Sequence, residues 1–531
     1  MGLVFNRADA SPPTFHALLR LSIFFTLSVF YLPMKYIVIL LVAVAAISCK
    51  QKKFDTIIRG GWVYDGSGKE GVTTDIGINA DTIAAIGDLS MATSDVSVDA
   101  SGLTLSPGFI DAHSHHDWGM SGMRDLPACV SQGITTIVVG QDGGSHFPLS
   151  AFFGEVEKNP VAVNVASYSG HNTLRDSVIS GDFKRFCTPE EIEQMKKMLE
   201  QDMQAGALGL STGLEYDPGI FSAPEEVVGL AQVAQQLGGR YISHIRSEDR
   251  YYWKAISEII NIGKQTGIPV QISHAKLAMK SIQGQSEKLI SRLDSARAVG
   301  INITADIYPY TFWQSTMTVL FPARNFKDKK EAQFAVSEIT TPDGVLIGNF
   351  SPDTTYIGKT LAEIAALRKK DAAVTLMDMI EEIEKKNGDE SVIVTSMIED
   401  DIAAIMRWPH TVICSDGSGV GRHPRGYGAF TKVLRKYVRE DSVLTLAEAI
   451  HKMTGLTAEN LNIKKRGKVE VGYFADLVMF DFEEVSDQST PQKPQLRSKG
   501  IEKVWVNGEE VYSVNKSTGR YPGKVIRRAT K

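Results

Sequence analysis

The sequence predicts an α/β protein: a closed (β/α)8 TIM-like barrel, with a small β-sandwich domain built from both chain ends. Three observations predict this fold. From about residue 103 onward, short apolar runs alternate with helical patterns. Eight such runs can be counted, which is the number that a closed barrel of βα units requires. The two flanks instead alternate like antiparallel strands. A doubly wound open sheet is the alternative architecture.

Each predicted strand is separated from the next by a turn or a helix. Thr188 is a typical N-cap, followed by Pro189 in the first turn and by two early acids. A second helix, APEEVVGLAQVAQQLGG, repeats this pattern and ends at Gly238-Gly239. The strand runs are LTLSPGFIDAH, ITTIVVG, VNVASYSG, ALGLST, RYISHI, PVQISH, NITADIY and TVICSD.

The flanks and one long connection complete the predicted domains. Three segments alternate like antiparallel strands: FDTIIRGGWVYDGSG near residue 54, and ADLVMFDF and IEKVWVNGEEVY near the other end. Within the last of them, Asn507-Gly508 predicts a hairpin turn. We expect sandwich parts at 53–106 and 463–515, the barrel at 107–462 and a basic tail at 516–531. Residues from about 325 to 400 exceed a normal crossover, so we expect an insertion that caps the site.

Residues 1–49 have the character of an export segment. MKYIVILLVAVAAISC begins at Met34 with a lysine, an apolar run and small residues before Cys49, and it is too short for a comfortable membrane span. Its end, Ala46-Ile47-Ser48-Cys49, resembles a bacterial lipoprotein box with Ala in place of the usual Leu. This predicts an exported cell-envelope protein that starts at Met34 and is lipidated at Cys49. An ordinary secretion signal, which would make it periplasmic, or a single membrane anchor is the alternative.

Composition narrows the classes of partner. The net charge is -5, so no nucleic-acid partner is implied, and a membrane would be contacted only through the N-terminal lipid. The four cysteines, Cys49, Cys129, Cys187 and Cys414, lie far apart and make no disulfide framework.

Polar side chains gather where the predicted strands end, which is where parallel barrels carry their chemistry. Taken singly, each has a structural explanation: a lone histidine is more often hydrogen-bonded than a ligand, and an aspartate before glycine can cap a helix. Together they predict a site for zinc or a similar first-row ion. The residues that coincide at the strand ends are His113, His115, His244, His274 and Asp416.

This arrangement resembles the amidohydrolase superfamily and, more finely, its N-acyl-D-amino-acid deacylase (D-aminoacylase) family. The motifs that carry the resemblance run in order from about residue 105 to 481. They are PGFIDAHSHHD, GITTIVVGQDG, GHNTLR, GALGLSTGLEYDPG, SHIRSE, ISHAK, DIYPY, SDG, HPRGYGAF, YVRE, MTGLTAENL and RGKVEVGYFADLVMFD. The strand ALGLSTG has no lysine, unlike the branches that bridge two metals with a lysine on strand four.

The resemblance implies roles for the metal ligands and the base. His244 and His274 would hold a tightly bound zinc, and His113 and His115 would contact a second, weaker metal position. Asp416 would be the general base that takes a proton from the attacking water.

The resemblance also implies a substrate site. Lys276, Tyr308 and Arg425 would receive the substrate carboxylate, and Ser315 would join them although its spacing from Tyr308 is one residue longer than usual. His171 would line the site without a defined role.

One position departs from the family pattern. The family places a metal-ligating cysteine on strand two in a Gly-Asn-Cys-Gly setting, whereas this chain has Gly140-Gln141-Asp142-Gly143. A carboxylate can ligate or bridge zinc, and it is a harder ligand than a thiolate, so metal preference would move toward other divalent ions. The alternative is that Asp142 no longer binds metal.

The function that the resemblance implies is zinc-dependent hydrolysis of the amide bond of N-acyl-D-amino acids, a C–N bond other than a peptide bond. The substrate would be a small N-acyl amino acid. Another amidohydrolase activity, such as a D-residue dipeptidase or a cyclic-amide hydrolase, is the nearest alternative. A non-catalytic lipoprotein that binds a ligand is the alternative from another class.

Overall fold

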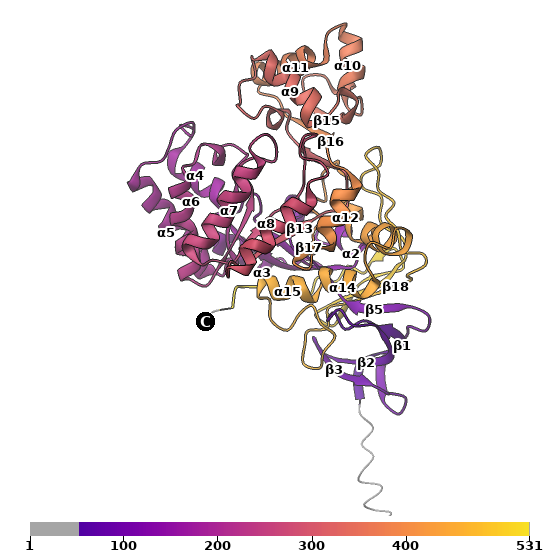
Figure 1. Ribbon diagram of the computed structural model, residues 1–531. Coiled ribbons are helices and arrows are strands. Elements are labelled where there is room, and N and C mark those ends of the chain that lie inside the picture. Colours follow the sequence, from indigo (N-terminus) through magenta and orange to yellow (C-terminus); the bar gives the residue numbers. More distant parts are fainter. Residues whose placement is uncertain (1–52, 530–531) are drawn as a thin grey trace, which may run out of the picture. The chain divides into compact units, whose positions relative to one another are not determined.

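Eight parallel strand positions within residues 53–529, the part of the chain that the computed structural model describes, form a barrel (Figure 1). Position three is split into β8 and β9: β8 pairs with β7, and β9 pairs with β10. The closed barrel is therefore confirmed over the open sheet. Its strands are β6 (Phe109–Asp111), β7 (Ile134–Val139), β8 (Asn164–Ser167), β9 (Ser169–Gly170), β10 (Gly209–Gly213), β11 (Arg240–His244), β12 (Val270–Ile272), β13 (Ile303–Ile307) and β17 (Thr411–Ile413).

The ring closes between the first and last strands, just beyond their carboxyl ends. The Asp416 N–H donates to the His113 carbonyl at 2.9 Å, and the His115 N–H donates to the Gly417 carbonyl at 2.8 Å. The barrel is thus sealed by the same segments that were predicted to carry the metal ligands and the base.

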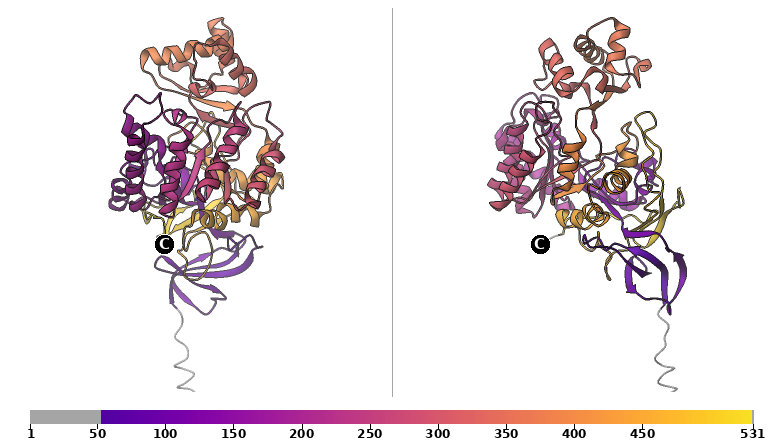
Figure 2. Two further views of the ribbon diagram at one scale, coloured as in Figure 1. Left: turned by 60° about the vertical axis from the view of Figure 1, so that its left-hand side comes forward. Right: turned by 45° about the vertical axis from the view of Figure 1, so that its right-hand side comes forward.

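Helices cover the outside of the strands (Figures 1 and 2). The predicted start at Thr188 is confirmed: its side chain and that of Glu191 form a capping box, with Pro189 in the first turn. The helices around the barrel are α2 (Pro127–Val130), α3 (Leu149–Lys158), α4 (His171–Ile179), α5 (Pro189–Ala205), α6 (Pro224–Gln236), α7 (Tyr252–Thr266), α8 (Ser286–Ala298), α12 (Glu399–Arg407), α13 (Arg425–Lys432), α14 (Leu446–Met453) and α15 (Gly455–Leu461).

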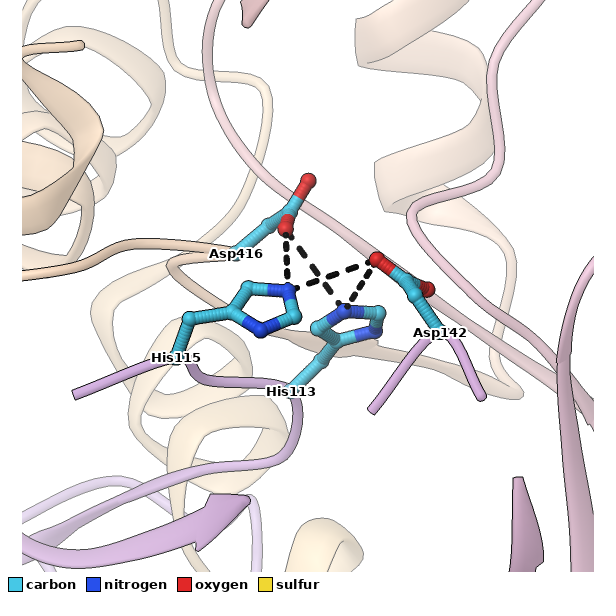
Figure 3. Close-up of side chains that lie close together, drawn as sticks. All are labelled: His113, His115, Asp142 and Asp416. Atoms are coloured by element: carbon cyan, nitrogen blue, oxygen red, sulfur yellow. Dashed lines mark ion pairs between the residues drawn. The ribbon is translucent and has the colours of Figure 1, made fainter. Parts of the chain in front are cut away.

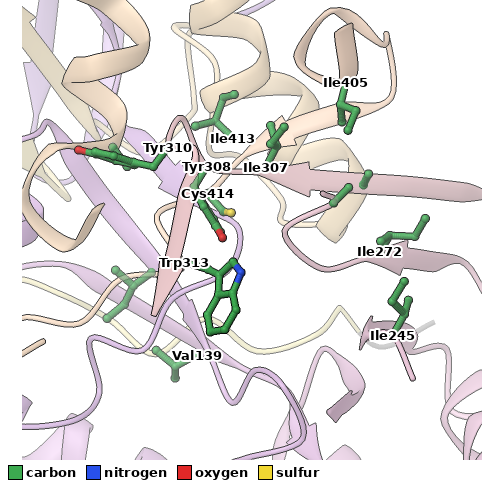
Figure 4. Packing of buried hydrophobic residues seen from close by; sticks show 14 of the residues in the cluster. Val139, Ile245, Ile272, Ile307, Tyr308, Tyr310, Trp313, Ile405, Ile413 and Cys414 are labelled. Carbon is green, nitrogen blue, oxygen red and sulfur yellow. The ribbon is translucent and has the colours of Figure 1, made fainter. Parts of the chain in front are cut away.

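The buried core lies largely between these helices and the strands. Ile272, Ile307 and Ile413, from three neighbouring strands, belong to one cluster with Tyr308 and Trp313 (Figure 4). Packing of this kind fixes the strands, and hence the residues at their ends, to within small displacements.

Both chain ends contribute to one further sheet of nine strands in the described residues. Asn507-Gly508 forms the hairpin turn between β19 and β20, as predicted, with φ of 49° and 81° at the two residues. The sheet encloses its own apolar cluster, which includes Ile76 and Trp505. Its strands are β1 (Lys53–Val63), β2 (Val72–Asn79), β3 (Thr82–Gly87), β4 (Thr93–Asp99), β5 (Thr104–Pro107), β18 (Leu477–Phe480), β19 (Ile501–Val506), β20 (Glu509–Ser513) and β21 (Lys516–Ser517).

A segment inserted between β13 and β17 forms an antiparallel sheet, in the order β14-β16-β15, with helices α9 to α11. It begins before residue 325, because 312–315 already pairs with β16. Its elements are β14 (Phe312–Ser315), α9 (Lys329–Phe334), β15 (Val345–Phe350), α10 (Leu361–Arg368), α11 (Ala372–Lys386) and β16 (Glu390–Thr395).

The C-terminal segment returns to the barrel. The Val165 N–H donates to the Lys524 carbonyl at 3.0 Å, and the Ile526 N–H donates to the Val165 carbonyl at 2.8 Å, so this segment runs alongside β8. Ile526 also packs against a cluster that includes Leu208 and Leu461. The tail beyond β21 is therefore part of the fold.

The predicted start at Met34 and the predicted lipidation at Cys49 are not tested by the structure. The export segment with Met34 and Cys49 lies outside the described residues. Within residues 53–529, no helix is long and apolar enough to cross a membrane.

A buried polar network joins the small sheet to the barrel. The Arg466 guanidinium donates to the Asp476 carboxylate and, at 2.8 Å, to the Asn507 side-chain oxygen. The Asn507 N–H donates to Asp476 at 2.7 Å, and the Asn164 amide donates to Asp476 at 3.2 Å. Arg466, Asp476 and Asn507 are each at most 5% exposed, so the charges are paired away from water.

We predict that Asp476→Asn destabilises the protein by about 3 kcal/mol, because removing one partner leaves a buried guanidinium uncompensated. Urea unfolding monitored by circular dichroism measures this change. Asp81→Asn is the matched control: Asp81 pairs with Lys524 at 2.8 Å, but the two side chains are 37% and 50% exposed. That change should cost less than about 1 kcal/mol. Equal losses of unfolding free energy in the two variants would contradict the conclusion that the buried Arg466–Asp476 pair contributes more to stability than the exposed pair.

Candidate active site

The predicted ligands and base all lie at one end of the barrel, where the strands finish. They come from five strand positions, which lie apart in the sequence but surround one centre. These residues are His113 and His115 after β6, Asp142 after β7, His244 at the end of β11, His274 after β12 and Asp416 after β17.

The backbone turns sharply at three of these residues. The φ angles are 52° at Asp142, 33° at His274 and 47° at Asp416. This left-handed region is uncommon for residues with a side chain, although Asp and His enter it more often than most. Each such residue costs about 1–3 kcal/mol and persists where the surroundings enforce it. The backbone at these three strand ends therefore lowers the stability of the barrel, and in return it directs the three side chains toward the centre.

Four side chains form the first group of candidate ligands (Figure 3). The His113 Nε2 lies 3.4 Å from an Asp142 oxygen and 3.5 Å from an Asp416 oxygen. The His115 Nε2 lies 3.3 Å from each of the same two oxygens. Two imidazole nitrogens and two carboxylate oxygens therefore face one point.

Asp142 also reaches a second group, which contains His244 and His274. Its other oxygen, Oδ1, lies 3.4 Å from the His274 Nε2. That nitrogen lies 3.0 Å from the His244 Nδ1. Because each oxygen of Asp142 faces a different group, this carboxylate has the geometry of a bridge between two metal positions.

The spacing of these atoms fits a metal ion. Two ligand atoms at about 2.1 Å from an ion, in tetrahedral geometry, lie about 3.4 Å apart. The separations of 3.3–3.5 Å in the first group match this value and exceed a good hydrogen bond. Within the described residues, both ring nitrogens of His113 and the Oδ1 of Asp142 are buried without a hydrogen-bond partner. Buried polar atoms normally have partners, so their arrangement fits an ion as the missing one.

The electrostatics of the first group also favour a cation. Burial opposes ionisation of Asp142, but the charges of His113 and His274 outweigh it and hold the pKa of this carboxyl well below its ordinary value. Burial likewise opposes ionisation of Asp416, where Arg425 is the main cause of a lowered pKa. Burial opposes protonation of His115, yet its contacts with the two carboxylates raise its pKa to about 10. The carboxylates thus remain anionic.

Two carboxylates that the sequence analysis missed orient the second pair of histidines. A Glu215 oxygen lies 2.9 Å from the His244 Nε2, the ring nitrogen that faces away from His274. Glu248 lies 3.3 Å from the His274 Nδ1. Partners of this kind fix the tautomer and orientation of a ligating imidazole. Both glutamates belong to quoted motifs, GLEYDPG and SHIRSE, but the sequence could not show which side chain they contact.

The predicted carboxylate-binding residues come together beside this centre. Arg425 forms an ion pair with Asp416 at 2.6 Å, and its guanidinium lies 4.8 Å from the centre of the Tyr308 ring. The Lys276 amine lies 5.9 Å from the same ring and pairs with Glu248 at 2.6 Å. The Tyr308 hydroxyl is buried, with no hydrogen-bond partner among the described residues. Two cations and one free hydroxyl thus converge, as a carboxylate site requires.

Two cavities, whose linings share Asp416 and Arg425, lie at this centre. The first has an empty volume of about 460 Å³ and is lined by His244, His274 and Lys276, among others. The second is wider, about 1030 Å³, and is lined by His115 and Asp142. Gln314 and Ser315 of the inserted segment line both cavities.

His171 is not placed with the other predicted residues. Its Nε2 lies 2.8 Å from a Glu226 oxygen, and Arg175 donates to the same carboxylate at 2.7 Å. All three side chains are fully buried between helices, and His171 is absent from the lining of both cavities. The expectation that it lines the site is corrected: a position after a strand does not decide into which layer a side chain packs.

His423 is a further residue that the sequence analysis did not single out. Its Nε2 lies 2.8 Å from the Phe312 carbonyl, and its Nδ1 accepts from the Arg425 N–H at 3.0 Å. The His423 N–H donates to the Gln314 side chain at 2.9 Å. The imidazole therefore ties the segment that carries Arg425 to the first strand of the insertion. Its position two residues before Arg425 was the available signal.

The sequence as a whole matches a known family. The model of the Amidohydrolase family matches residues 97–338 and 349–512, more than half of the chain. The chain belongs to this family. The amidohydrolase assignment agrees with the barrel and with the ligand groups at its strand ends.

Individual relatives refine the comparison. The chain is 36% identical over 502 residues to an N-acyl-D-glutamate deacylase of Alcaligenes xylosoxydans xylosoxydans, covering 90% of this chain and 97% of the relative. It is 34% identical to a D-aminoacylase of the same organism, and the match covers 90% of this chain and 98% of that relative. The crystal structure of an N-acyl-D-glutamate deacylase from Bordetella bronchiseptica, complexed with zinc and a phosphonate inhibitor, superposes with a TM-score of 0.81. The two chains are 34% identical, and the match covers 90% of this chain and 100% of that one.

We predict that Asp142→Ala lowers the divalent metal content of the purified protein, because it removes one oxygen from the group with His113 and one from the group with His274. Inductively coupled plasma mass spectrometry after dialysis measures the stoichiometry. Asp117→Ala is the control, since Asp117 is a buried carboxylate paired with His146 at 3.1 Å, outside both groups. Unchanged metal content in Asp142→Ala would show that this carboxylate is not a ligand.

Proposed function

We propose that this amidohydrolase cleaves the amide bond of N-acyl-D-amino acids to a carboxylate and a free D-amino acid. The observation that carries the proposal is that two candidate metal ligands, His244 and His274, line one cavity together with Asp416 and with the cluster of Lys276, Tyr308 and Arg425. The two curated relatives described above are named for the deacylation of N-acyl-D-glutamate and for D-aminoacylase activity, which supports the D configuration.

We propose zinc as the metal, held by His244, His274 and Asp142, with a second and weaker position at His113 and His115. The zinc complex of the Bordetella bronchiseptica relative supports this choice. A divalent ion supplies Lewis acidity, which polarises a carbonyl and lowers the pKa of a water molecule from about 15.7 to about 7. Asp142 stands where the family pattern has a cysteine, and its harder oxygen ligands favour other divalent ions more than a thiolate would.

Asp416 serves as the general base and acid. Its Oδ1 lies among the ligand atoms of the first group, and its Oδ2 forms an ion pair with Arg425 at 2.6 Å. The lowered pKa, which Arg425 causes against the effect of burial, keeps the carboxylate ionised before the reaction. It accepts a proton from the attacking water and delivers that proton to the leaving amine nitrogen.

Lys276, Tyr308 and Arg425 hold the α-carboxylate of the substrate, with Ser315 at the edge of the same cavity. Arginine can bind a carboxylate through two parallel hydrogen bonds, which fixes its plane. With the α-carboxylate and the scissile amide both fixed, the two remaining substituents on Cα are distinguished by position. The site can therefore select one enantiomer.

We predict that Asp416→Asn retains its metal but lowers kcat by about 10³-fold, because an amide cannot accept the proton. Amine release at saturating substrate measures kcat, and metal analysis of the same preparation measures occupancy. Asp117→Asn, which changes a carboxylate outside the cavities, should keep both. An Asp416→Asn enzyme with the activity of the unmodified chain would exclude Asp416 as the base.

The activity itself is tested by amine release from N-acetyl-D- and N-acetyl-L-amino acids with acidic, apolar and small side chains, using the zinc-loaded full chain. We expect release from D substrates and at least about 100-fold less from their L counterparts, the scale of discrimination that misplacement of the reacting group produces. Loss of release after chelation and its return with zinc would link activity to metal. Release only from dipeptides that end in a D residue would replace the deacylase assignment with a dipeptidase.

A further inference from the structure

The two cavities divide a bound substrate into its two halves. Asp416 and Arg425 line both cavities, so the scissile amide belongs at their junction. Lys276 and Tyr308 line the smaller cavity and not the wider one. If the α-carboxylate binds there, as the proposed function requires, the amino-acid half occupies the smaller cavity and the acyl group enters the wider one.

The wider cavity extends well beyond the junction, with an empty volume of about 1030 Å³. At the junction itself its wall is polar, because Gln314 and Ser315 line both cavities. Trp118 is the one large apolar side chain among the described residues that lines the wider cavity alone. An acyl group that contacts Trp118 therefore has to extend beyond the residues that the two cavities share.

Trp118 offers an apolar face to such a group. On one side its ring lies 6.1 Å from the ring of His146, which in turn stacks on Phe152 with 4.2 Å between centroids. Trp118 is nevertheless 60% exposed. A large aromatic ring that is supported on one side and open on the other is typical of a surface that binds a ligand.

Val420, which is 55% exposed, lies beside the loop that carries Trp118. A β-carbon at Gly119, the residue after Trp118, would lie 3.1 Å from the Val420 Cγ1. The Tyr427 hydroxyl donates to the Gly419 carbonyl at 3.2 Å, which holds the loop of Val420 against α13. The apolar surface of Trp118 thus continues onto a second, fixed loop.

Leu496 extends this surface from a third part of the chain. It is 43% exposed. The side chain of its neighbour Gln495 donates to the Gly419 carbonyl at 3.4 Å, so the loop of Leu496 lies against the loop of Val420. Three exposed apolar residues that are distant in the sequence therefore gather at one rim.

A surface groove continues from the wider cavity along this rim. Gly421 lines both the cavity and the groove, which has an empty volume of about 710 Å³. Besides Val420 and Leu496, the groove is lined by Pro494 and by the long cationic side chains of Arg422 and Lys493. Cationic side chains of this length cover apolar groups with their methylene stems while the charged ends stay in water.

The metal of the proposed function does not alter this argument. His115 and Asp142, which line the wider cavity, belong to the first ligand group. An alkyl chain carries no charge, so its binding depends on the apolar area that it removes from water. Acyl groups of different length therefore present the same carbonyl to the same metal and differ in that area.

From this path we propose that the enzyme has an extended acyl subsite, formed by Trp118, Val420 and Leu496, that binds the alkyl chain of a fatty acyl group. The preferred substrates are then N-(fatty acyl)-D-amino acids rather than N-acetyl-D-amino acids. The subsite rests on the proposed deacylase function. It adds a preference that the name of the N-acyl-D-glutamate relative leaves open, since that name specifies the amino acid and not the acyl group.

The test measures kcat/KM on the zinc-loaded full chain for the acetyl, butanoyl, hexanoyl and octanoyl derivatives of D-alanine, D-leucine and D-glutamate. Complete burial of one methylene group strengthens binding about fourfold. Because the rim is open to water on one side, we expect about twofold for each methylene, or about 50-fold between acetyl and octanoyl. The gain should appear mainly in KM, since the chain makes the same contacts in the ground state and the transition state.

Two substitutions remove apolar surface from the rim. Trp118→Ala should lower the octanoyl-to-acetyl ratio of kcat/KM about tenfold, and Val420→Ser about threefold. The matched controls are Phe186→Ala and Val471→Ser, at residues that are 69% and 57% exposed and line neither the cavities nor the groove. Both controls should leave the ratio unchanged. Thermal unfolding of each variant establishes that it is folded.

The outcomes separate the two levels of the proposal. Cleavage of the acetyl derivatives, with octanoyl no better than acetyl, overturns the extended acyl subsite and leaves the deacylase function standing. The same holds if the unmodified chain prefers octanoyl but folded Trp118→Ala and Val420→Ser both keep its ratio. Release from none of the substrates overturns the deacylase function, and the subsite falls with it.

Discussion

The structure depends on one arrangement: the carboxylate of Asp142 lies among three imidazoles at the open end of the barrel. Its two oxygens face different groups, at 3.4 Å from the Nε2 of His113 and 3.4 Å from the Nε2 of His274. Such atoms are too far apart for good hydrogen bonds and too well buried for water to solvate them fully. The surrounding features follow from holding them there: the left-handed backbone at three strand ends, the sealed seam between the first and last strands, and the glutamates behind His244 and His274.

The positions of most candidate ligands could be predicted from the sequence, because in a parallel barrel the order of the strands along the chain fixes where each strand end lies. A residue at the end of a strand lies at the same end of the barrel as every other such residue. His113, Asp142, His274 and Asp416 are therefore brought together although up to about 300 residues separate them in the sequence. The Asn507-Gly508 turn and the capping box at Thr188 were predictable for a local reason, since each depends on neighbouring residues alone.

The rest depends on packing between elements, which one sequence does not reveal. His171 follows a strand as the ligands do, yet it pairs with Glu226 of α6 rather than facing the centre. Glu215 and Glu248 lie in loops, where no periodicity assigns a direction to a side chain. The early start of the insertion was missed because the partner of β14 lies some eighty residues later, and pairing over that distance leaves no local pattern.

The segment that runs beside β8 has a consequence for how the fold is completed. Val165 hydrogen-bonds with Lys524 and Ile526, close to the last described residue. Asn164, next to it, binds both Asn507 and Lys524. A chain that contains all eight barrel strands but not residues 524–526 lacks these partners, so one edge of β8 stays unpaired in it. Loss of residues 524–526 would therefore leave an open strand edge that is available for aggregation.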